Sequence, residues 1–117
     1  MATHTTVNRD FLTSSTITAI GAAMTSSFDL AAYSEGQLFI NVTAASAGAG
    51  SPTLDLVFET SSDGGTTWYT HTTIAQITTV SNVRVALTNF GSDCRVKYTL
   101  GGTTPSMTFS LRFKGKT

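Results

Sequence analysis

Apolar and polar residues alternate along five segments of the chain. Every second side chain in these segments is apolar, and the residues between them are mostly polar or charged. The apolar positions are Leu38, Ile40 and Val42; Leu54, Leu56 and Phe58; Val83, Val85 and Leu87; Cys94, Val96, Tyr98 and Leu100; and Met107, Phe109, Leu111 and Phe113. A period of two is typical of strands with one buried and one exposed face. The pattern therefore predicts at least five half-buried β-strands.

Residues that favour turns separate these segments. Runs rich in Gly, Pro, Asn and Asp occupy 47–52, 63–65, 89–93 and 101–105, and such residues accept turn dihedrals. The spacing predicts two hairpins, one joining 53–60 to 66–71 and one joining 93–100 to 106–114. Weaker strands are expected at 14–20 and 25–30. A short helix at 18–24 or 29–34 is disfavoured because neither stretch has a clean amphipathic repeat.

The fold class follows from the number of strands and the length. A chain of 117 residues is enough for one domain with its own core. About eight short strands predict an all-β, single-domain antiparallel β-sandwich, jelly-roll or immunoglobulin-like, or a small barrel, with little or no helix. The expected core comprises Leu38, Ile40, Leu54, Leu56, Phe58, Trp68, Val85, Val96, Tyr98, Phe109 and Leu111.

The first thirteen residues, MATHTTVNRDFLT, carry little apolar content. We expect a flexible N-terminal arm at 1–13, able to order on a neighbouring subunit, followed by the sandwich domain at 14–117. No secretion signal or membrane-spanning run is apparent in the sequence. The single cysteine, Cys94, excludes an internal disulfide.

Hydroxyl side chains dominate the composition. Thr and Ser supply 36 of 117 residues, whereas charged residues make up only 12%, with a net charge of zero. Low charge weakens the mutual repulsion that keeps proteins apart. The composition fits a subunit of an assembly, and it fits a solitary β-domain with a neutral surface equally well.

The stretch 61-SSDGGTTW-68 predicts a tight turn. Asp63 can accept backbone hydrogen bonds, Gly65 allows positive φ, Ser61 or Thr67 can tie the ends, and Trp68 starts the return strand. The stretch resembles the Asp-box of sialidase-like propellers, which is a structural hairpin repeated once per blade. It occurs here once, in a chain too short for a propeller, and the arginine cluster of sialidases is absent. A structural turn is therefore expected.

A second resemblance covers roughly residues 53–115. The run LDLVFETSSDGGTTWYT, followed by VRVALTNFGSDCRVKYTLGGTTPSMTFSLRFKGK, resembles small virion structural proteins of tailed bacteriophages. The resemblance implies a role as a capsid decoration (cement) protein, or as a head or tail accessory component. It also implies the major capsid protein or other virion subunits as partners, a homo-oligomer (a trimer is one option), and location in the virion after synthesis in the host cytoplasm. It implies no set of functional residues.

Charges are distributed unevenly along the chain. Residues 1–83 hold six of the seven acidic residues and one basic residue, whereas residues 84–117 hold six basic residues and one acidic residue. Arg95 and Lys97 share one strand face, and Arg112 and Lys114 share another. In a terminal hairpin these four would form one basic patch that docks on an acidic partner. The alternative is cross-strand pairing with Asp55 and Glu59. Zero net charge disfavours nucleic-acid binding.

Exposed aromatic side chains suggest one further interpretation. Phe39 and Tyr69 have outward parity, and Tyr33 and Phe90 lie in expected loops. Such rings can stack on sugars, which would make the chain a carbohydrate- or host-surface-binding module. The alternative is that the N-terminal arm or a neighbouring subunit covers them, and we favour this alternative.

Catalytic and metal sites find little support in the sequence. His4 and His71 lie too far apart for a ligand pair. Cys94 has inward parity and is expected to be a buried, inert thiol. The carboxylates of Asp55 and Glu59 lie outward with no expected cleft around them. We therefore expect a protein that is not an enzyme and that needs no cofactor.

Overall fold

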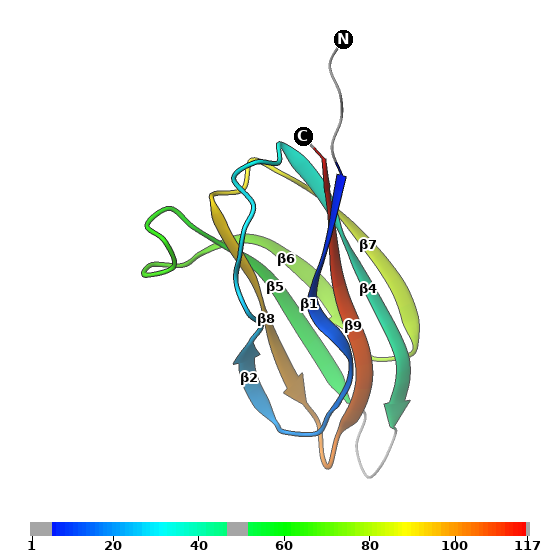
Figure 1. Cartoon of the computed structure of the whole chain (residues 1–117). Helices are drawn as coiled ribbons and strands as arrows, with labels where there is room; N and C mark the ends of the chain where they lie inside the picture. The colour runs from blue at the N-terminus through cyan, green and yellow to red at the C-terminus, as the bar shows by residue number, and fades with distance from the viewer. Residues whose placement is uncertain (1–5, 47–51, 117) are drawn as a thin grey trace.

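The computed structural model describes residues 6–46 and 52–116 as two antiparallel β-sheets packed face to face (Figure 1). No helix occurs in this part of the chain, and hence none that is long and apolar enough to span a membrane. The strands are β1 (Thr6–Ile17), β2 (Gly21–Met24), β3 (Phe28–Asp29), β4 (Glu35–Ser46), β5 (Thr53–Ser61), β6 (Tyr69–Ile77), β7 (Ser81–Thr88), β8 (Asp93–Gly101) and β9 (Ser106–Lys116). The predicted all-β sandwich is confirmed.

The chain passes back and forth between the two sheets. Sheet A has the order β1-β9-β4-β7, and sheet B has the order β2-β8-β5-β6, with β3 also paired to β8. The predicted hairpin between β5 and β6 is confirmed, since these strands pair in antiparallel register. It is the only pair of consecutive strands that are direct neighbours in a sheet within the described residues; the short β2 and β3 both border β8.

The predicted terminal hairpin of 93–100 with 106–114 is wrong. β8 belongs to sheet B and β9 to sheet A, so the connection at 102–105 crosses the sandwich. Both strands carry a long apolar face, and these faces lie against each other through the core: the rings of Tyr98 and Phe109 meet edge to face at 5.7 Å. A loop of this length can form a hairpin or a crossover, and burial of both apolar faces favours the crossover.

The expected flexible arm is also corrected. Residues 6–13 lie in β1, which pairs with β9 along its length, whereas residues 1–5 lie outside the described residues. The most buried side chain of this strand is Phe11, which is 4% exposed and meets the ring of Phe28 at 5.3 Å and that of Phe58 at 6.1 Å. Val7, Leu12 and Ile17 also pack against the core, and burial of the Phe11 side chain alone contributes about 1.5–3 kcal/mol.

The core lies between the sheets and follows the predicted alternation closely. Of the expected core residues, those that are fully buried are Leu38, Ile40, Leu54, Leu56, Phe58, Val96, Phe109 and Leu111. Val85 and Tyr98 are half-buried against this core. Trp68 is different: it precedes β6 and stacks with Arg95 on the outer side of sheet B, so its predicted place in the core is wrong.

Candidate binding surfaces

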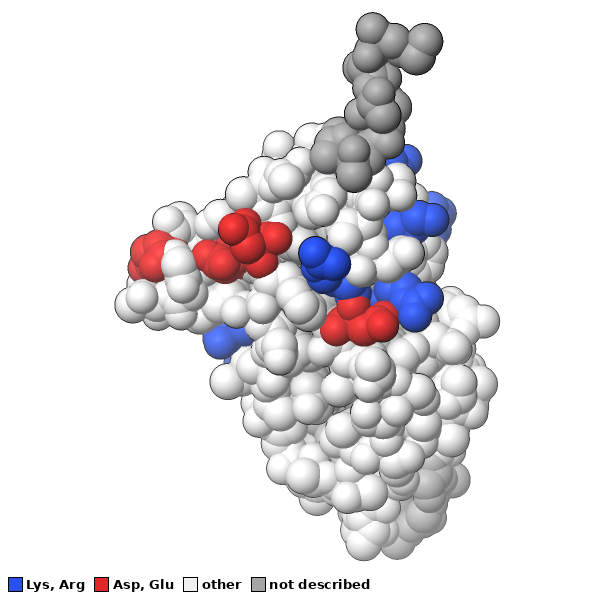
Figure 2. All heavy atoms as spheres, in the orientation of Figure 1, with Lys and Arg blue, Asp and Glu red and all other residues white. Residues whose placement is uncertain are grey.

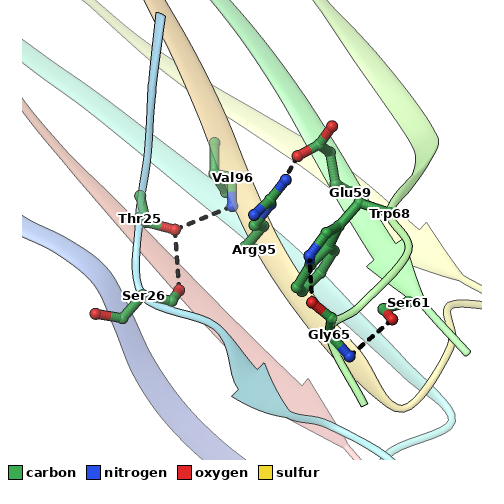
Figure 3. Close-up of polar contacts among 8 residues, drawn as sticks. All are labelled: Thr25, Ser26, Glu59, Ser61, Gly65, Trp68, Arg95 and Val96. Atoms are coloured by element: carbon green, nitrogen blue, oxygen red, sulfur yellow. Dashed lines mark hydrogen bonds and ion pairs between the residues drawn. The ribbon is translucent and has the colours of Figure 1, made fainter. Parts of the chain in front are cut away.

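The turn between β5 and β6 is held together by its own side chains (Figure 3). The buried hydroxyl of Ser61 donates to Asp63 Oδ1 at 2.8 Å and accepts the backbone N–H of Gly65 at 2.9 Å. Asp63 Oδ1 also accepts the N–H of Thr66 at 3.1 Å and of Thr67 at 2.8 Å. Gly64 and Gly65 have φ values of 75° and 97°, which favour glycine. The predicted structural role of this motif agrees with these contacts.

The electrostatics of the turn follow from the same bonds. The backbone N–H of Thr67, together with the hydroxyl of Ser61, lowers the pKa of Asp63 from 3.8 to about 2. Hydrogen bonds to a carboxylate favour its charged form. Asp63 therefore stays ionised while its Oδ1 organises the turn.

Trp68 forms a stack on the outer face of sheet B, drawn in Figure 3. Its indole N–H donates to the carbonyl oxygen of Gly65 at 3.0 Å, and the guanidinium of Arg95 lies 4.2 Å from its ring centroid. Arg95 Nε also donates to Glu59 Oε1 at 2.8 Å. This arrangement joins a cation–π contact to an ion pair. It ties the turn to the sheet. The alternative expectation, that Asp55 and Glu59 pair with basic residues across the strands, is confirmed for Glu59. Asp55 instead accepts a hydrogen bond from the side-chain amide of Gln76.

The predicted basic patch is not formed. Arg95 and Lys97 lie on β8 in sheet B, whereas Arg112 and Lys114 lie on β9 in sheet A. The outer faces of a sandwich point in opposite directions, so the four side chains cannot contact one flat partner. Arg112 is also occupied, because its Nε donates to Asp10 Oδ1 at 2.8 Å.

The two exposed aromatic rings also lie on different sheets. Phe39, on β4, is 37% exposed on the outer face of sheet A, and its register neighbours are Arg84 and Arg112. Tyr69, at the start of β6 in sheet B, is 57% exposed. Tyr33 and Phe90 pack against the core instead. The rings therefore provide no shared stacking platform for a sugar.

One end of the sandwich is free of charge, a feature that the strand and turn patterns did not predict. The connections at 18–20, 78–80 and 102–105 all lie at this end, together with the start of β5 (Figure 1). None of their described residues is Lys, Arg, Asp or Glu. Figure 2 shows the same feature on one face, where the coloured charged atoms occupy the upper half and the lower half is white. Ile20 and Val80, which are 65% and 60% exposed, lie in two of these connections.

The signal for this uncharged end was present in the sequence. Residues 11–28, 36–54, 64–83 and 98–111 contain no Lys, Arg, Asp or Glu. Each run includes strand ends that lie at this end of the fold. The topology is needed to interpret the pattern, because only antiparallel strands that reverse at the same end bring the four runs together.

Side chains with reactive atoms have structural partners. Cys94 is fully buried, and burial raises the pKa of its thiol to about 11. His71 Nε2 lies 2.6 Å from the carbonyl oxygen of Thr88, which joins the edge of sheet B to the end of β7 in sheet A. His4 lies outside the described residues. Within residues 6–46 and 52–116, no group of three or more His, Cys, Asp or Glu side chains could hold a metal ion.

A surface hollow lies between the edges of β6 and β7. It has a volume of about 390 Å³ and is lined by apolar side chains such as Ile74, Ile77, Val83 and Val85. Its lining includes no charged residue.

No known protein-family model matches the chain, and a search of curated proteins found no significant match.

Proposed function

We propose that this chain is a non-enzymatic structural protein of a bacteriophage virion, and specifically a capsid decoration protein that docks on the shell through its uncharged end. The observation that carries the proposal is the charge-free set of connections with exposed Ile20 and Val80. The centres of protein interfaces are depleted in charged residues, because burying an unpaired charge is costly. An end made of hydroxyl, alkyl and glycine groups avoids that cost.

The rest of the fold suits a mechanical role. The two sheets share one continuous core that reaches from Phe11 and Phe113 at one end to Leu54 and Met107 at the other. Such a closely packed unit is rigid and transmits strain. A rigid body that contacts two adjacent shell subunits would resist their separation. Many copies on a symmetric shell would make even weak contacts effective.

The resemblance of residues 53–115 to virion proteins supports the same class of function. Within residues 53–115, the segment after β5 forms the turn around Asp63, the stack of Arg95 on Trp68 and strand β9. All three stabilise the fold. The four candidate partner-binding cations and the two exposed aromatic rings are divided between opposite faces. The uncharged end is therefore the better candidate for attachment to the shell.

The test uses phage heads assembled without this protein. The purified protein is mixed with these heads, which are then separated by sedimentation and challenged with heat, chelator or osmotic shock. We expect retention at a fixed ratio to the capsid subunit and recovery of resistance. No retention on heads, together with binding to separately purified tails, would overturn the decoration role in favour of a tail component. Binding to a glycan array without binding to heads would favour a host-surface role.

A further inference from the structure

The zero net charge of the chain conceals a separation of charge between the two sheets. Sheet A carries five basic and two acidic side chains, a net charge of +3, whereas sheet B and its turn carry two basic and five acidic side chains, a net charge of −3. The bases of sheet A are Arg9, Arg84, Arg112, Lys114 and Lys116, and the acids of sheet B are Asp29, Asp55, Glu59, Asp63 and Asp93. In Figure 2 most acidic atoms lie at left, whereas most basic atoms lie at the centre and right, with one acidic group among them.

The ion pairs do not cancel this separation, because each lies within one sheet. Arg112 pairs with Asp10 at 2.8 Å and Lys116 with Glu35 at 3.9 Å in sheet A, and Arg95 pairs with Glu59 at 2.8 Å in sheet B. Among the described residues, no salt bridge engages Arg84, Lys114, Asp55 or Asp93. The described charged side chains without a salt bridge are thus all basic on sheet A, whereas on the strands of sheet B the acids Asp29, Asp55 and Asp93 outnumber the one base, Lys97.

Sheet B also places like charges next to each other. Asp29 and Asp93 are directly opposite in the register of β3 and β8, and like charges in such positions repel. A cationic surface over this face would relieve that repulsion. Sheet A supplies such a surface, since Arg84 on β7 and Lys114 on β9 lie on its outer face and form no salt bridge.

Each face also has an apolar side chain near its centre. On sheet A, Phe39 lies in register between Arg84 and Arg112. On sheet B, Met24 and Val57 lie in register on either side of Lys97, and Met24 is 50% exposed. Aromatic residues, Met and Arg are the residues enriched at protein interfaces.

From these observations we propose that the outer face of sheet A binds the outer face of sheet B of a second copy of this chain. The contact joins two different surfaces, so it leaves one face of each copy free and repeats from copy to copy. Repetition of such a heterologous contact gives a closed ring or an open filament. Sheet A and sheet B of one molecule carry opposite net charges, so each face of one copy is electrostatically complementary to the other face of a second copy. This complementarity favours a second copy over an unrelated protein as the partner.

The position of the charges also fixes the relative direction of neighbours. On both faces most of the charged side chains lie toward the end that bears the Asp63 turn; the exception is Asp55, which lies near the start of β5. The charged halves of two copies meet only when the copies point the same way. All uncharged ends then face one side. That they face a shell rests on the proposed function, whereas the contact between copies does not.

The experiment measures the mass of the full-length protein in solution, without capsids, by sedimentation velocity. We expect oligomers at about 0.01 M salt, where the Debye length is about 30 Å, and dissociation at about 1 M, where it is about 3 Å. The variant Arg84→Glu/Lys114→Glu reverses face A, and Asp55→Lys/Asp93→Lys reverses face B. Each is expected to weaken association at low salt by about tenfold or more, with an unchanged circular dichroism spectrum.

The chain that carries all four substitutions is the decisive control. Its net charge is again zero and its faces are again opposite in sign, so it is expected to recover association at low salt, at least in part. A folded wild type that stays monomeric at low salt would overturn the proposal. So would a folded fourfold variant that associates no better than the two double variants. Because no capsid is present, failure here is distinguishable from failure of attachment to heads.

Discussion

The two ends of the sandwich satisfy their surface groups in different ways. At one end, the Ser61–Trp68 turn engages its own carboxylate, hydroxyl and indole groups, and Arg95 covers the Trp68 ring. At the other end, the described connections hold no charge and leave Ile20 and Val80 exposed. The turn at the first end satisfies these polar groups internally, whereas the exposed apolar side chains at the second end gain by burial. The conspicuous motif in the sequence thus stabilises the fold, and the inconspicuous runs around it are the better candidates for binding.

The largest expected effect comes from adding charge to the uncharged end. The variant Ile20→Lys/Val80→Lys should bind heads about a hundredfold more weakly, which corresponds to about 2.7 kcal/mol, because binding would then have to bury two unpaired charges. Both side chains are exposed, so the free energy of unfolding should change little. Co-sedimentation with heads measures the affinity.

The matched control places the same two charges at the opposite end. Ser62 and Thr66 are exposed in the turn, and the backbone N–H of Thr66 rather than its side chain bonds to Asp63. Ser62→Lys/Thr66→Lys should bind heads as the wild type does. Equal loss of binding for both variants would show that attachment depends on overall charge and not on the uncharged end.

The next effect concerns the turn itself. Ser61→Ala removes a buried hydroxyl and leaves the N–H of Gly65 without its partner, which should lower the free energy of unfolding by about 1–3 kcal/mol. Ser62→Ala, at the exposed neighbouring position, should change it by less than about 0.5 kcal/mol. Urea denaturation measures both. A Ser61→Ala variant that is as stable as Ser62→Ala would contradict the role assigned to the turn.

Acid should weaken the same turn within a defined range of pH. The pKa of Asp63 is about 2 in the folded chain, below its ordinary value of 3.8, so its contribution to stability is present above pH 3.8 and is lost as the pH falls through about 2. The Asp63→Asn variant lacks this titration. The difference in melting temperature between the two proteins should therefore shrink across this range. A constant difference would show that the ionised carboxylate does not organise the turn.

The smallest effect is expected at Cys94. Burial raises the pKa of its thiol to about 11 from 9.0, so at about pH 8 the folded protein should react with an aromatic disulfide reagent far more slowly than the unfolded protein. The reaction is followed by absorbance with and without denaturant. Equal rates would mean that the sandwich opens readily at β8.

Local patterns in the sequence predicted β4, β5, β7, β8 and β9, the β5–β6 hairpin and the turn, because alternation and turn chemistry act over a few residues. They missed β2, and the strands expected at 14–20 and 25–30 overlap only the end of β1 and the two residues of β3. They did not predict the partners of β8 and β9, since a short loop serves a hairpin and a crossover alike. They also misassigned residues 6–13 as an arm, because its few apolar residues, Val7, Phe11 and Leu12, do not follow a strict period of two although all three pack in or against the core. The predicted basic patch is wrong for the same reason, because it required β8 and β9 to be neighbours in one hairpin.

The uncharged end illustrates a different limit. Each of its four runs is ordinary when taken alone, and only the antiparallel topology brings them to one place. The separation of charge between the sheets depends on topology in the same way. Surface properties that arise from several strands cannot be assigned before the strands are ordered.

The central claim is that the uncharged end attaches to the shell, and backbone hydrogen exchange tests it most directly. The protein is compared free and bound to heads that lack it. We predict slower exchange on binding at 18–20, 78–80 and 102–105, with no change at 62–67. Protection confined to the turn at 62–67, or absent from all three connections of a bound protein, would contradict this claim.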